Sequence, residues 1–204
     1  MIEKTDENSL GVVSNCWKFQ LDAGEPLRDL VGRAVAEGFQ FIELRQGCLG
    51  ECEDTETRLP RVDVLASLAQ QLPEITFDLA VELPIFSRSI DPASGNVRIM
   101  LEAAHALADD RRPAHLRIVD LVSKRVPAAR SEELQPRPEF TFEDVSASLL
   151  NLQKELPSGV LSVEHSFQPW SGFRRLFEDT RLGGDSEDAT FTSPKLCYDP
   201  CNFW

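Results

Sequence analysis

Apolar and polar residues follow two spacings along the chain, one typical of buried strands and one typical of amphipathic helices. Short apolar runs predict six strands, at residues 10–16, 39–45, 76–83, 116–121, 160–164 and 195–199. Apolar residues that recur every three or four positions predict helices at residues 26–38, 60–73, 100–107, 141–156 and 171–181. Because strands separated by helices pair in parallel through right-handed crossovers, the pattern predicts an α/β fold.

The two faces of the predicted strands differ in polarity. In the third strand Phe77 and Leu79 are large and apolar, whereas Asp78 and Glu82 lie on the opposite face. A parallel sheet that is covered by helices on both sides is more often apolar on both faces. A barrel instead opens into a site at the C-terminal ends of its strands. The pattern therefore favours a (β/α)8 TIM-barrel type of fold.

The chain length bounds how much of such a barrel is present. A closed barrel has eight strands and usually about 250 residues, whereas this sequence supplies about six βα units in 204 residues. We therefore interpret residues 1–204 as a single barrel domain that is incomplete at its C-terminus. No glycine-rich phosphate-binding motif follows the first predicted strand, which removes the usual nucleotide-binding signature of an open sheet.

The net charge and the hydropathy of the chain limit the kinds of molecule that it can bind. Lys plus Arg number 21 and Asp plus Glu number 34, and the resulting net charge of −13 repels nucleic acid and anionic membranes. No apolar run approaches the ~20 residues of a membrane span, and the acidic N-terminus is unlike a signal peptide. We expect a cytoplasmic protein. The open edges of the first and sixth strands favour a homo-oligomer.

Acidic residues end five of the six predicted strands: Glu43, Glu82, Asp120, Glu164 and Asp199. The C-terminal ends of parallel strands meet at one mouth of a barrel, so these acids converge there. Unpaired carboxylates at close range raise one another's pKa values, and a divalent cation is the simplest way to hold them together. The alternative for each acid is a helix cap or an ion pair, and Arg45, two residues after Glu43, is an obvious ion-pair partner for one of the acids.

Cysteine and tryptophan residues near the same mouth allow two further interpretations. Two pairs, Cys48 with Cys52 and Cys197 with Cys201, have a spacing that four thiolates of a structural zinc site could use. The odd total of five cysteines, without a secretory signal, instead indicates reduced thiols. Trp17 is a candidate apolar platform for a sugar ring, and its alternative role is to anchor a loop.

Three segments together resemble a known superfamily. They are GFQFIELR at residues 38–45, LSVEH at residues 161–165 and LCYDPCN at residues 196–202. In order and spacing they resemble the xylose isomerase-like TIM-barrel superfamily, and the resemblance covers nearly the whole chain. That group contains sugar isomerases, sugar-phosphate isomerases and epimerases, and DNA-repair enzymes of the endonuclease IV type.

The resemblance implies a role for particular residues. Glu164 matches a glutamate that binds a divalent metal and serves as acid and base, and Asp199 matches a metal-binding aspartate. Asn202 matches an asparagine that often follows it, and Glu43 matches an acid that shapes the pocket. Further substrate contacts are expected from Arg45, Glu82, His165 and Trp17. The expected cofactor is Mn²⁺, Mg²⁺, Co²⁺ or Zn²⁺, and the expected activity is isomerisation or epimerisation of a sugar or sugar phosphate by proton transfer beside a carbonyl.

Two other functions remain open. One is an endonuclease IV-like phosphodiesterase, although the strong acidity and the three histidines argue against DNA binding and a histidine-rich metal cluster. The other is a non-catalytic truncated barrel that acts as a binding or assembly subunit. It is favoured because the superfamily's remaining metal ligands, a histidine and a second glutamate, belong to a seventh and an eighth strand that have no counterpart here.

Overall fold

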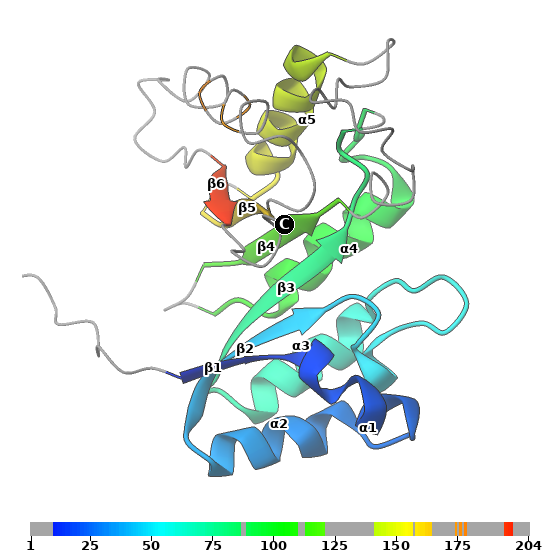
Figure 1. Cartoon of the computed structure of the whole chain (residues 1–204), viewed down its shortest axis with the longest axis vertical. Coiled ribbons are helices and arrows are strands. Elements are labelled where there is room, and N and C mark those ends of the chain that lie inside the picture. Colours follow the sequence, from blue (N-terminus) through cyan, green and yellow to red (C-terminus); the bar gives the residue numbers. More distant parts are fainter. Residues whose placement is uncertain are drawn as a thin grey trace, which may run out of the picture.

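A single parallel sheet organises the chain. The computed structural model describes residues 10–86, 89–109, 113–120, 141–156, 158–164 and 194–197, together with residues 174, 176 and 178. Its strands are β1 (Leu10–Val13), β2 (Phe39–Arg45), β3 (Thr76–Glu82), β4 (His115–Val119), β5 (Val160–Glu164) and β6 (Lys195–Cys197). They follow one another in the sheet in chain order, and every neighbouring pair is parallel. Figure 1 shows this succession from β1 to β6.

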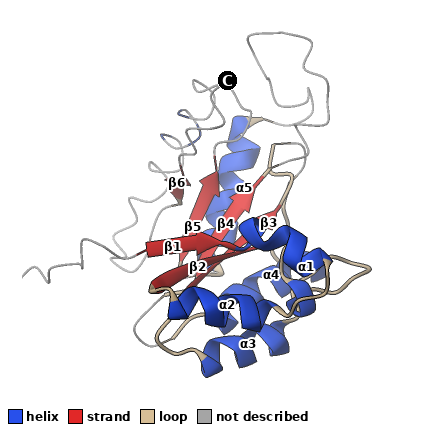
Figure 2. Ribbon diagram, turned by 60° about the horizontal axis from the view of Figure 1, so that its bottom comes forward, coloured by secondary structure: helices blue, strands red, loops and turns tan. Residues whose placement is uncertain are grey.

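Helices connect the strands. They are α1 (Lys18–Asp22), α2 (Leu27–Ala36), α3 (Val62–Gln71), α4 (Gly95–Ala106) and α5 (Phe142–Lys154), with short 3₁₀ turns at Ser14–Trp17 and Gly50–Cys52. Figure 2 shows α2, α3 and α4 gathered on one side of the sheet. Strands in sequential parallel order, with helices gathered on one side, form a mixed α/β fold that is compatible with part of an α/β barrel.

The hydrophobic core lies between the helices and one face of the sheet. Alternate strand residues such as Ile42, Leu79 and Leu116 are fully buried against apolar helix positions such as Leu27 and Leu149. Because strand side chains alternate between faces, this arrangement assigns the intervening residues to the opposite face, which we call the inner face.

The first strand is shorter than the predicted residues 10–16. It ends at Val13, and a 3₁₀ turn and the short helix α1 follow, neither of which the hydrophobic pattern indicates. The Ser14 hydroxyl accepts a hydrogen bond from the backbone N–H of Arg45 at 2.9 Å. A side chain thus takes the place of the next backbone hydrogen bond between β1 and β2. Helix α1 has no buried residue, and its Phe19 is 88% exposed, so no apolar periodicity marks it.

Helix α5 begins at the capping box that the sequence predicts. The backbone N–H of Asp144 donates to the Thr141 hydroxyl at 3.2 Å, and the Thr141 N–H donates to the Asp144 carboxylate at 2.8 Å. Hydrogen bonds from the backbone N–H and hydroxyl of Thr141 hold the pKa of Asp144 below its ordinary value. The predicted cap is confirmed, and it satisfies backbone groups that the first turn leaves without partners.

Two glycines make a matched test of the packing. A Cβ at Gly159 would lie 2.7 Å from the carbonyl oxygen of Ala114, which already accepts from the Val160 N–H, so it cannot move without breaking that bond. A Cβ at Gly32, inside α2, would have no atom within 4 Å. We expect Gly159→Ala to lower the free energy of unfolding by about 1–3 kcal/mol. We expect Gly32→Ala to raise it by about 0.5–1 kcal/mol.

Urea unfolding followed by circular dichroism measures both free energies. Equal effects of the two substitutions would contradict the close approach of the residue 114 and residue 159 backbones.

In the part of the chain that is described, no helix has the length and apolarity needed to cross a membrane.

Candidate functional site

Charged and polar side chains gather on the inner face. Glu43 and Asp78 are paired in register across β2 and β3, and Arg117 and Ser162 are paired across β4 and β5. We define the inner polar cluster as Glu43, Arg45, Asp78, His115, Arg117, Ser162 and Glu164. Its acids are among the most buried charged residues of the described chain, since Glu43 is 3%, Asp78 4% and Glu164 5% exposed.

The centre of the cluster is an ion pair between Arg117 of β4 and Glu43 of β2, which reaches across β3. Burial raises the pKa of Glu43 above its ordinary value, and the Arg117 charge opposes that rise without cancelling it. Arg117 Nε is buried and has no hydrogen-bond partner among the described residues. A buried pair of this kind contributes most through the penalty that follows when one partner is removed.

A hydrogen-bonded chain of three side chains lies beside this pair. His115 Nδ1 is 2.5 Å from Asp78 Oδ2, and His115 Nε2 is 2.9 Å from Ser162 Oγ. Adjacent strands β3, β4 and β5 present these side chains on the same face. The imidazole therefore links the strands on either side of its own.

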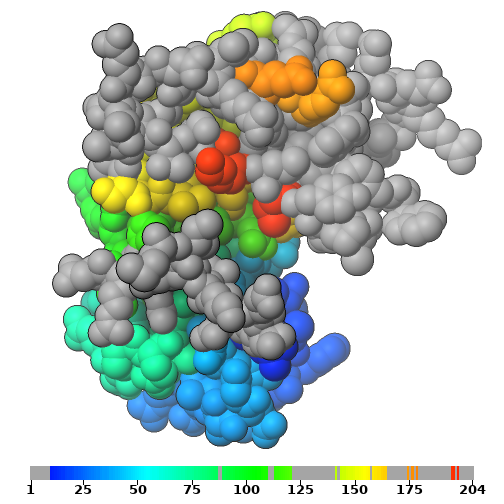
Figure 3. All heavy atoms as spheres, turned by 90° about the vertical axis from the view of Figure 1, so that its left-hand side faces the viewer, coloured from blue at the N-terminus to red at the C-terminus, as the bar shows by residue number. Residues whose placement is uncertain are grey.

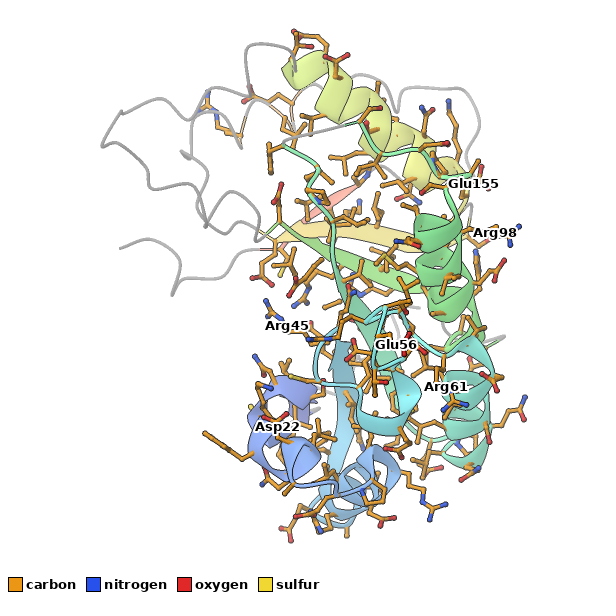
Figure 4. All side chains as sticks on the ribbon, turned by 90° about the vertical axis from the view of Figure 1, so that its right-hand side faces the viewer. Asp22, Arg45, Glu56, Arg61, Arg98 and Glu155 are labelled. Carbon is orange, nitrogen blue, oxygen red and sulfur yellow. The ribbon has the colours of Figure 1, made fainter. Side chains whose placement is uncertain are left out.

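The C-terminal end of the cluster contains Arg45 and Glu164. Arg45 Nη1 lies 3.9 Å from Glu164 Oε2, which is an ion-pair distance but longer than a hydrogen bond. In Figure 4 the labelled Arg45 lies on the side of the sheet away from α3 and α4. A charged donor and a buried carboxylate thus face each other at the ends of β2 and β5.

The strand-end acids do not all converge on this cluster. Glu82 ends β3 but is exposed, and it lines a separate hollow of about 480 Å³ with Asp91 and Asn96. Asp120 is 1% exposed, and its carboxylate accepts a hydrogen bond from the Phe86 N–H at 2.9 Å. The expectation that these two acids meet the others is wrong, because Glu82 turns to solvent and Asp120 anchors the loop after β3.

The ion pair expected between Arg45 and one of the strand-end acids is confirmed, since Arg45 pairs with Glu164 of β5. Glu43, two residues before Arg45 on the same strand, pairs directly with Arg117. Asp78 contacts His115, so each of the three buried acids of the cluster has a basic side chain as a partner among the described residues.

Trp17 lies away from the inner polar cluster. It lines a hollow of about 350 Å³ with Val12 of β1 and with Leu30 and Ala34 of α2. Val12 is in register with the buried Ile42, so this hollow is on the helix-covered side of the sheet. The structure therefore places Trp17 where it anchors the turn after β1 and not where it would contact a sugar on the inner face.

Two cysteines of the alternative zinc site, Cys48 and Cys52, are both buried. Burial raises the pKa of Cys52 to about 12, so without a metal the thiol keeps its proton. A zinc site at these residues stays a prediction. Cys197 is in register with Glu164, and Cys201 lies outside the described residues.

Three predicted site residues, His165, Asp199 and Asn202, also lie outside the described residues, so their placement stays a prediction. Within the described ranges no group of three His, Cys, Asp or Glu side chains is arranged to hold a metal ion. Figure 3 looks onto the molecule from the left of Figure 1 and shows the red residues of β6 beside the yellow end of β5.

Sequence reasoning missed four members of the inner polar cluster as functional candidates: Asp78, His115, Arg117 and Ser162. A signal in the sequence could have found them. Each of the four is paired in register with another residue of the inner face, and each alternates along its strand with apolar core residues. Alternation within β4, where Arg117 stands between Leu116 and Ile118, marks the charged residue as inner-facing once the neighbouring apolar residues are assigned to the core.

Comparison of the chain with protein-family models, with curated proteins and with solved structures finds no match. The function is therefore inferred from the chemistry of the inner face.

Proposed function

We propose that this chain forms most of a (β/α)8-type barrel and catalyses isomerisation or epimerisation of a sugar or sugar phosphate. The observation that supports the proposal best is the position of Glu164, a buried carboxylate at the C-terminal end of β5 that faces Arg45 at 3.9 Å. In barrels of this type the reacting groups stand at the ends of the strands.

Glu164 is the proposed proton acceptor. A carboxylate within about 2.6–3.2 Å of a C–H group beside a carbonyl removes that proton and returns it to the same or the adjacent carbon. The same carbon gives epimerisation, and the adjacent carbon gives isomerisation. Negative charge that develops on the carbonyl oxygen needs a fixed positive donor, and the Arg45 guanidinium next to Glu164 is suited to supply it.

Glu43 and Arg117 form the proposed floor of the site. Glu43 is buried, Arg117 is partly buried, and their ion pair joins β2 and β4, so both side chains are held in fixed orientations. Such a pair offers carboxylate acceptors and guanidinium donors to the hydroxyl groups of a sugar without a large cost of reorganisation. In this proposal Glu43 shapes the pocket and does not transfer a proton.

A divalent cation held by Glu164 and Asp199 belongs to the proposal only through the resemblance. The described residues do not fit a metal site by themselves, because Glu164 pairs with the cation Arg45 and no cluster of three possible ligands forms in the described ranges. The proton-transfer steps above are accordingly assigned to side chains alone.

Deuterium exchange tests the proposed reaction class. We expect the full chain, incubated in D₂O with aldoses, ketoses and their phosphates, to place deuterium at the carbon beside the carbonyl of one substrate pair. Proton NMR detects this loss of signal, and addition of a chelator followed by Mn²⁺, Mg²⁺, Co²⁺ or Zn²⁺ measures the cation requirement. Absence of exchange with every sugar would contradict the proposal, and cleavage of abasic DNA instead would favour the phosphodiesterase.

A further inference from the structure

The chain of Asp78, His115 and Ser162 takes no part in the proton transfer proposed above. Its two hydrogen bonds, at 2.5 Å and 2.9 Å, join a carboxylate to one imidazole nitrogen and a hydroxyl to the other. The order carboxylate, imidazole, hydroxyl is the one in which a serine oxygen is activated for attack on an acyl group.

The protonation pattern of the imidazole follows from its partners. A carboxylate is only an acceptor, so the hydrogen bond to Asp78 requires a proton on His115 Nδ1. With that single ring proton on Nδ1, Nε2 carries a lone pair, to which the Ser162 hydroxyl at 2.9 Å can donate. Asp78 is 4% exposed, so water does not compete with His115 for this hydrogen bond.

A positive donor lies on the strand beside the hydroxyl. Arg117 of β4 is the register partner of Ser162 on the same face of the sheet. Arg117 Nη1 is engaged by Glu43, whereas Nε is buried without a partner in the described chain. An unused N–H donor on this neighbouring strand is the candidate group to stabilise an oxyanion that forms at Ser162.

We propose that Ser162 is an acyl-accepting nucleophile, with His115 as its general base and Asp78 as the residue that positions the base. The substrate class is a small carboxylic ester. Ser162 Oγ bonds to the carbonyl carbon while its proton passes to His115 Nε2, and the C–O bond to the alcohol then breaks as His115 returns the proton to the leaving oxygen. Water repeats the sequence, releasing the acid and restoring the hydroxyl.

The three side chains of the proposed ester site differ in their exposure to solvent. Ser162 is 4% exposed, whereas the His115 and Arg117 side chains are 22% and 20% exposed. Solvent thus reaches the base and the cationic donor more readily than the nucleophile. A purely structural hydrogen-bond chain would have the same geometry but no reactivity toward an acyl or phosphonyl probe, so reactivity distinguishes the two roles.

A small alkyl fluorophosphonate is the probe, because it forms a stable bond with an activated serine oxygen and releases fluoride. We expect the folded full chain to gain one adduct, which peptide mass spectrometry locates at Ser162, and to lose this reactivity in urea. His115→Gln and Asp78→Asn, each checked for folding by circular dichroism, should slow labelling at least about 100-fold. Hydrolysis of p-nitrophenyl acetate should fall in parallel.

Ser146→Ala is the matched control, since Ser146 is also buried but its hydroxyl has no hydrogen-bond partner among the described residues. It should leave labelling and ester hydrolysis unchanged. The proposal is overturned if Ser162 stays unlabelled in the folded chain, or if labelling is as fast in a folded His115→Gln variant. It is also overturned if the unfolded chain reacts equally well at residue 162.

Discussion

Replacing Arg117 with methionine is expected to lower the free energy of unfolding by about 3–5 kcal/mol at neutral pH, because it leaves the Glu43 carboxylate buried without its partner. Methionine preserves most of the side-chain volume, so loss of packing contributes little. Urea unfolding followed by circular dichroism measures the change.

The pH dependence of this variant separates charge from packing. Burial already raises the pKa of Glu43, so the folded chain holds the carboxyl proton at higher pH than the unfolded chain does. Stability linked to that proton is complete below the ordinary carboxyl pKa and is lost as pH rises through the raised value. Removing Arg117 removes the main opposing influence, raises the pKa further, and moves this loss to higher pH.

We therefore expect the Arg117→Met variant to lose stability more steeply than the unchanged chain as the pH rises above the ordinary carboxyl pKa. Adding Glu43→Gln to the variant should remove this slope and recover much of the lost free energy, because residue 43 then carries no buried charge that lacks its partner. A pH-independent loss in the single variant, or no recovery in the double variant, would show that the ion pair is not what stabilises this part of the sheet.

Replacing Glu164 with glutamine is expected to slow deuterium exchange into the sugar by about 10²–10⁴-fold, because an amide of the same shape cannot accept the proton. Substrate binding should change much less, since glutamine still offers an oxygen and an N–H group to hydroxyls. The initial rate of exchange measured by proton NMR gives the effect, with the substrate found by the assay above.

Glu102→Gln is the control for this substitution. Glu102 lies on α4, its side chain is 52% exposed, and it pairs with Arg98 on the helix surface. Its replacement should leave the exchange rate unchanged. Full activity in the Glu164→Gln variant would sink the proposed role of Glu164, whereas loss in both variants would point to a general effect on folding.

Local pattern predicted several elements to within a residue or two. The ranges of β2 and β5 are as predicted, because each is a short apolar run preceded by a glycine and followed by polar residues. The start of α5 is confirmed by the capping box of Thr141 and Asp144, which acts within one turn of chain. Helix α1 was missed because its residues make no apolar stripe to detect.

The candidate site was likewise predicted only in part from the sequence. The sequence alone located Glu43 and Glu164 at strand ends and assigned them to the polar face, because alternation along a strand is a local property. It did not reveal that Glu43 pairs with Arg117, that His115 joins Asp78 to Ser162, or that Trp17 lies under α2.

The amino-acid sequence by itself thus determined the parallel α/β order of the elements and the polarity of each strand face. Only the tertiary structure decided which charges meet, because partners on different strands are chosen by the register between strands and by the twist of the sheet. These depend on how the whole core packs, and a spacing of two residues along one strand carries no information about them.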